Sequence, residues 1–232
     1  MADELVDESG NSLHFAFVEM LFALAIAQVA VEAADLANSS SVAQWLEHLP
    51  AYTHLVLATV IIAASWVGWG SSKSSKSPIK HVFSGHFFKL LVDVFLVVCY
   101  FIIVRTVETL DANGDINPSA NPEVLWTMVI LITYFIWDLL TKGRPSFTKF
   151  LRRGWASLLC AICAIVAFMY LPTKSHEVWA VVISDVALMV LVVMFRAMKL
   201  DDFPDLGKRH WLWAIFMVVF VALVSIANRL FS

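Results

Sequence analysis

The chain has 232 residues, of which 60% are hydrophobic and 15% are charged, and its net charge is −3 at pH 7. The mean hydropathy is +0.78. A soluble domain of this length cannot enclose so much apolar surface, which excludes a water-soluble protein and predicts an all-α integral membrane protein.

The apolar segments predict seven transmembrane helices in one membrane domain, 14–232, which follows an acidic tail, 1–13. The expected spans are 14–36, 51–70, 87–107, 123–141, 154–172, 176–198 and 210–230. At about 1.5 Å per helical residue, the first is long enough to cross the hydrocarbon core of a bilayer. The tail lacks Lys and Arg, and no small-residue cleavage site follows it, so we expect the first span to be retained.

The first span carries two stripes of residues at helical spacing. Four alanines share one face, which begins at Glu19: Ala23, Ala27, Ala30 and Ala34. Three polar residues lie on roughly the opposite side: Gln28, Glu32 and Asp35. This pattern predicts a helix that packs closely against a neighbour and lines a polar path.

The basic residues predict the orientation of the bundle. Most of the 16 Lys and Arg follow the second, fourth and sixth spans, within 71–89, 142–153 and 196–209. Positively charged connections stay in the cytoplasm. We therefore expect a multi-pass cell-membrane protein with a cytoplasmic N-terminus and an external C-terminus.

Enzyme and pigment classes fit the motifs poorly. Seven-span zinc hydrolases need several His within the membrane, whereas this chain offers His54 and His210 without an H-x-x-x-H in the last span. The last span also lacks the Lys that a retinal protein needs. Hydrolase and nucleotide-binding motifs are missing as well. We expect no metal or other cofactor, and an enzyme is the least favoured class.

Two of the acids within spans have a basic residue one turn away. Asp93 lies four residues after Lys89, and Asp138 lies four residues before Lys142. This spacing favours structural ion pairs within one helix.

Glu19 and Asp185 have no basic residue within one turn. A carboxylate at mid-bilayer costs on the order of 3 kcal/mol, so each should face the bundle interior. Two interpretations stay open: a place in an ion or proton path, or a buried carboxyl hydrogen-bonded to another helix. The candidate hydrogen-bonding partners are Ser65, Thr133, Tyr134 and Trp137.

The stretch from Phe17 to Ala27 and the Trp-rich end of the second span, Ser65 to Trp69, resemble known families. They are similar to the first two helices of the endolysosomal and bacterial potassium-channel family and of the low-temperature-requirement A family. The channel motif Arg-x-x-x-Phe-Ser-Asp reads differently here, with Leu13, Val18 and Glu19 in place of its Arg, Ser and Asp. The resemblance implies that the first span lines a pore between subunits, with Leu24 near the constriction, flanked by Leu21 and Gln28.

The expected function is conduction or transport of a small cation or proton through a helix-lined path, in a homo-oligomer within the lipid bilayer. The residues expected in the path or its gate are Glu19, Leu24, Gln28, Glu32 and Asp185. The alternative is a non-conducting sensor or effector subunit whose basic cytoplasmic face binds a soluble protein. We expect no nucleic-acid partner.

Overall fold

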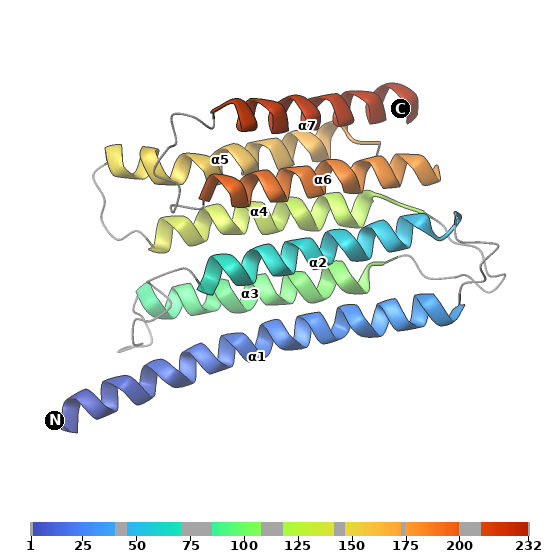
Figure 1. The fold of residues 1–232 in the computed structure, drawn as a ribbon. Helices are drawn as coiled ribbons and strands as arrows, with labels where there is room; N and C mark the ends of the chain where they lie inside the picture. The colour runs from blue at the N-terminus through green and yellow to red at the C-terminus, as the bar shows by residue number, and fades with distance from the viewer. Residues whose placement is uncertain are drawn as a thin grey trace.

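A computed structural model describes residues 2–39, 46–70, 85–107, 118–141, 147–172, 175–199 and 210–231. These residues form seven α-helices and no strand, which confirms the all-α prediction (Figure 1). The helices are α1 (Ala2–Ser39), α2 (Leu49–Gly70), α3 (Gly85–Arg105), α4 (Asn121–Thr141), α5 (Phe147–Tyr170), α6 (Val178–Lys199) and α7 (His210–Phe231).

Six of the described helices are long and apolar enough to cross a membrane, and the apolar part of α5, Trp155–Tyr170, is shorter. The helix ends lie close to the expected ones except at two starts: α1 continues through the acidic tail to Ala2, and α5 begins at Phe147, before the expected residue 154. The start of α4 follows ordinary helix chemistry: Pro122 occupies the first turn, where its missing N–H costs nothing, and Glu123 complements the positive end of the helix dipole.

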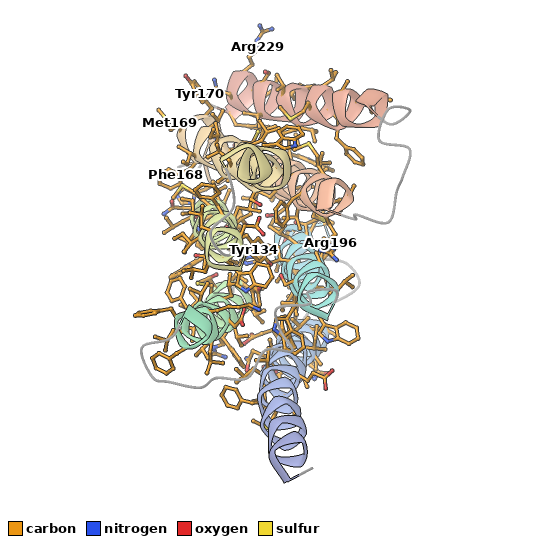
Figure 2. The ribbon with its side chains drawn as sticks, turned by 90° about the vertical axis from the view of Figure 1, so that its left-hand side faces the viewer. Tyr134, Phe168, Met169, Tyr170, Arg196 and Arg229 are labelled. Carbon is orange, nitrogen blue, oxygen red and sulfur yellow. The ribbon has the colours of Figure 1, made fainter. Side chains whose placement is uncertain are left out.

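The helices form two layers of three, with α7 across one end. Figure 2, which looks along the helices, shows α3, α4 and α5 in one layer and α1, α2 and α6 in the other. The strongest packing joins α2 to α6, α4 to α5 and α6 to α7, whereas α1 contacts only α2 and α3 extensively. Consequently α1 and α7 are the edge helices, and α2, α3, α4 and α6 form the centre.

The core is continuous through these central helices. Among its fully enclosed side chains are Ile61, Tyr100, Ile130, Leu188 and Leu191. Full burial of such a side chain stabilises the fold by about 1.5–3 kcal/mol where the alternative is water. A side chain that would otherwise contact lipid gains little of this stabilisation, because lipid is equally apolar. Close packing and buried polar contacts therefore determine which helices associate.

Candidate functional site

The central helices hold two buried polar clusters at different depths. The first, the Asp185 cluster, consists of Thr53, His54, Glu123, Thr127 and Asp185. The second, the Asp93 cluster, consists of Ser65, Lys89, Asp93, Tyr100, Tyr134 and Trp137. From His54 to Ser65 along α2 the rise is about 17 Å, so the clusters lie near opposite ends of the spans.

The Asp185 cluster is organised around a histidine that α2 places against α3 and α4. His54 Nε2 lies 2.7 Å from the carbonyl oxygen of Ile103, and its Nδ1 lies 2.9 Å from Glu123 Oε1. Both side chains are fully buried. On the neighbouring face of α2, Thr53 Oγ1 donates to Asp185 Oδ2 over 2.7 Å.

The contacts of His54 constrain its protons. A carbonyl oxygen can only accept, so Nε2 carries a hydrogen. Nδ1 then either donates to an ionised Glu123 as an imidazolium or accepts from a protonated Glu123. The ring of His54 and the carboxyl group of Glu123 therefore lie within ion-pair distance of each other in a fully enclosed site.

The Asp93 cluster joins α3 to α4 through an indole. Trp137 Nε1 donates to Asp93 Oδ1 over 2.6 Å, and Lys89 Nζ lies 4.9 Å from the centroid of the Trp137 ring. Lys89 and Asp93 are both buried, and their charges interact. Trp69 is a second indole donor to the Asp93 carboxylate, so α2 also joins this cluster.

A chain of hydroxyl groups continues from this cluster across the bundle. Ser65 is hydrogen-bonded to the Tyr134 hydroxyl, which lies 3.0 Å from the Tyr100 hydroxyl. The Tyr134 ring stacks on Phe195, with 5.2 Å between centroids and 8° between planes. Ser65 Oγ donates to the Ile61 carbonyl over 2.5 Å, so it accepts from the Tyr134 hydroxyl, which in turn accepts from the Tyr100 hydroxyl.

The Asp93 cluster borders a cavity of about 70 Å³. Half of the lining residues are aromatic, and they come from five helices. Two lining residues are charged, Asp93 and Arg196. The full set is Phe22, Ala64, Ser65, Gly68, Trp69, Asp93, Leu96, Tyr100, Tyr134, Trp137, Phe195 and Arg196. Figure 2 labels Tyr134, which lies between the two layers, and Arg196, which lies beside α2. A volume of this size has room for about five water molecules.

An apolar layer separates the two clusters. It contains Ile61 of α2, Ile130 of α4 and Leu188 and Leu191 of α6, each at most 1% exposed. These side chains belong to one continuous core cluster. Apolar side chains of three central helices therefore lie between the two polar sites.

The structure places two of the expected path residues on the outside of the molecule. Glu19 is exposed on α1 and has no hydrogen bond or ion pair with the described residues, and Leu24 is 48% exposed. The four alanines of the first span are exposed as well, so within one chain they do not meet a neighbouring helix.

The polar stripe of α1 turns towards α3. Gln28 Nε2 donates to Glu32 Oε1 over 2.9 Å, and Arg105 Nη1 donates to the same oxygen over 2.7 Å. Arg105 is 67% exposed in this pair. This arrangement attaches α1 to α3 near one end of the bundle.

The remaining expected residues divide between the described and undescribed parts of the chain. Asp185 is fully buried and accepts a hydrogen bond from Thr53, which is not one of the four expected candidates. Asp138 accepts a hydrogen bond from Ser157 of α5. Lys142, the expected partner of Asp138, lies outside the described residues.

Sequence reasoning missed the residues that complete both clusters. Glu123 belongs to an acidic stretch that reads as a solvated turn, and His54 stands alone in its span. One signal in the sequence could have paired them. His54 lies near the start of the second span and Glu123 at the start of the fourth, and both of these spans are expected to start on the same side of the membrane. In the sequence, Arg196 lies at the end of the sixth span, where a basic residue indicates only the orientation of the helix.

Within the described residues, no group of three or more His, Cys, Asp or Glu side chains is placed to hold a metal ion. Comparison of the chain with protein-family models, curated proteins and solved structures gave no match.

Proposed function

We propose that this membrane protein passes protons across the bilayer through its four central helices. The observation that carries the proposal is the buried His54–Glu123 pair, in which Nδ1 and Oε1 lie 2.9 Å apart and His54 Nε2 lies 2.7 Å from the Ile103 carbonyl oxygen. Ionisable residues inside a membrane bundle often belong to proton relays or ion pathways. The Asp93 cluster, about 17 Å away, supplies a second station.

The groups present suit a proton better than a metal cation. Lys89 and Arg196 both lie at or beside the cavity, and their positive charges oppose a second cation there. A proton needs only groups that donate and accept in turn, and the hydroxyls of Ser65, Tyr134 and Tyr100 form such a series. The cavity offers space for water to extend this series.

The apolar layer makes the proposed path a gated one. Ile61, Ile130, Leu188 and Leu191 have no polar side-chain atom to carry a proton, and the hydroxyl of Thr133, one turn after Ile130, donates to the Val129 carbonyl of its own helix. Passage requires that this layer admit water or that the central helices shift. We therefore expect slow, driven flux rather than the rate of an open pore.

The proposed orientation places the Asp93 cluster on the cytoplasmic side. The connections 71–84, 142–146 and 200–209 lie outside the described residues. The first two are rich in Lys and Arg, and the third contains Lys208 and Arg209 after three Asp; these basic residues predict a cytoplasmic location. A cysteine introduced at Ser74 or Ser146 should resist an impermeant thiol reagent added outside intact cells. Labelling at both positions would reverse the orientation.

The experiment is proton uptake by liposomes that contain the purified chain and an internal pH-sensitive dye. A potassium gradient with valinomycin supplies the driving potential. We expect flux with the parent protein and flux near that of protein-free liposomes with Glu123→Gln, which keeps the shape but cannot hold the proton. Asp35→Asn, at an exposed position on α1, is the matched control and should behave like the parent. An inactive parent protein would contradict the proposal.

A second path, along α1 between subunits, is favoured by one observation. The face that carries Ala23, Ala27, Ala30 and Ala34 is exposed in the single chain, where it is free to contact a second copy. The two paths predict different sensitive residues, because a subunit interface would respond to Ala27→Leu and the central path would respond to Glu123→Gln.

A further inference from the structure

We propose that the cavity beside Asp93 is a binding site for a small organic carboxylate, held by Arg196. The inference is independent of proton passage, since it rests on the cavity wall and not on the His54–Glu123 pair. It assigns a ligand class to a site whose hydroxyl groups and space for water the proposed proton path also uses.

Arg196 is a cation without a counter-ion in the described structure. Its Nε is buried and has no hydrogen-bond partner, and no ion pair joins it to the described residues. Asp93, the other charged group in the wall, already interacts with Lys89 and accepts from Trp137. The wall therefore has one uncompensated positive charge, which a ligand carboxylate would neutralise through charge-assisted hydrogen bonds.

The rest of the wall restricts the ligand further. Six aromatic rings line the cavity, so the body of the ligand is expected to be apolar: Phe22, Trp69, Tyr100, Tyr134, Trp137 and Phe195. Asp93 accepts from the indoles of Trp137 and Trp69, and its carboxylate has lone pairs left to accept a hydrogen bond from a hydroxyl on the ligand. Room for about five waters suits a short hydroxy acid of about six non-hydrogen atoms.

The backbone of α2 is shaped to admit the guanidinium group. A Cβ atom added at Gly68 would lie 2.7 Å from Arg196 Nη1, closer than such atoms approach, so a larger residue there must push the guanidinium away. The obstructed atom is the flexible end of a side chain, so the displacement should leave the fold intact. A Cβ at Gly70, two residues on, would meet nothing within 4 Å.

The test is the binding of lactate to the full-length purified chain in detergent, followed by the fluorescence of the tryptophans, two of which line the cavity. Lactamide, which is nearly isosteric with lactate but uncharged, is the control ligand. For so small a ligand we expect a Kd on the order of 1 mM for lactate and at least about tenfold weaker binding of lactamide.

The variants separate the proposed contact from folding. Gly68→Ala and Arg196→Gln should each weaken lactate binding by at least about tenfold, whereas Gly70→Ala should leave it unchanged. The unfolding temperature reports whether each variant is folded, and Gly68→Ala decides the question if Arg196→Gln does not fold. Equal binding of lactate and lactamide, no binding of lactate by the parent, or equal effects of the two glycine substitutions would overturn the proposal.

Discussion

The edge helix α1 and the central helix α6 are both apolar enough to cross a membrane, yet they differ in what surrounds them. In the most apolar stretch of α1, 17% of the residues are buried, against 56% in α6. Glu19 of α1 is exposed, whereas Asp185 of α6 is fully buried and bonded to Thr53. Two acidic residues, each within an apolar helix, thus have different environments.

This contrast shows what a hydrophobic pattern leaves open in a membrane protein. Lipid and protein interior are equally apolar, so an ordered stripe of alanines does not reveal which side of a helix is covered. The buried acids of the central helices carry that information, because each must find polar partners on another helix. The comparison predicts that substitutions in the core affect folding and flux, whereas those on the outer face of α1 affect at most assembly.

The largest expected effect on stability is at His54. His54→Ala leaves the fully buried Glu123 without its partner, and breaking a buried pair in this way costs about 3–5 kcal/mol of unfolding free energy. Chemical unfolding in detergent micelles measures the change. Gln28→Ala, which removes a partly buried hydrogen bond of α1, is the comparison and should cost much less. If His54→Ala lowered the unfolding free energy less than Gln28→Ala, the predicted difference between the central helices and the edge helix α1 would be wrong.

A packing test gives the next largest effect. Ala58 of α2 is completely enclosed, so Ala58→Leu should overpack the core and lower the unfolding free energy by about 1–3 kcal/mol. Ala27→Leu adds the same atoms to an exposed position of α1 and should leave the unfolding of the single chain unchanged. If Ala27→Leu also altered the size of the protein in mild detergent, α1 would be the subunit interface. Equal destabilisation by both would contradict the described burial.

The smallest effect is expected where α1 joins α3. Arg105 and Glu32 form an ion pair whose Arg side chain is 67% exposed. Exposed pairs contribute about 0.2–1 kcal/mol, so Arg105→Ala should change the unfolding free energy only slightly, and less at high salt. A loss as large as that of His54→Ala would mean that the end of α1 is far more important to the fold than its exposure indicates.

The sequence predicted the helices well and the site in part. Runs of about 20 apolar residues define spans almost independently of tertiary structure, which is why six of the seven expected spans met the length and composition of a membrane helix. The tail was harder, because its acidic composition does not distinguish a free segment from the extension of α1 to Ala2. The cytoplasmic placement of the N-terminus stays a prediction.

Within the site, the sequence identified single acids but not their partners. Asp185 and Asp93 stand out because a charged residue in a span is costly. Thr53 and Asp185 are 132 residues apart, and nothing local to either shows that α2 and α6 pack together. The contact between His54 and Glu123 depends on how α2 and α4 are placed relative to each other. The order of residues along the chain does not contain that information.

The central claim, that the path runs through the core and not along α1, is tested most directly by comparing two isosteric substitutions in the liposome proton-uptake assay. Asp185→Asn removes a buried charge from α6, and Glu19→Gln removes an exposed one from α1. The account predicts strongly reduced flux with Asp185→Asn and parental flux with Glu19→Gln, with both proteins folded. Parental flux with Asp185→Asn and lost flux with Glu19→Gln would contradict it and assign the path to α1.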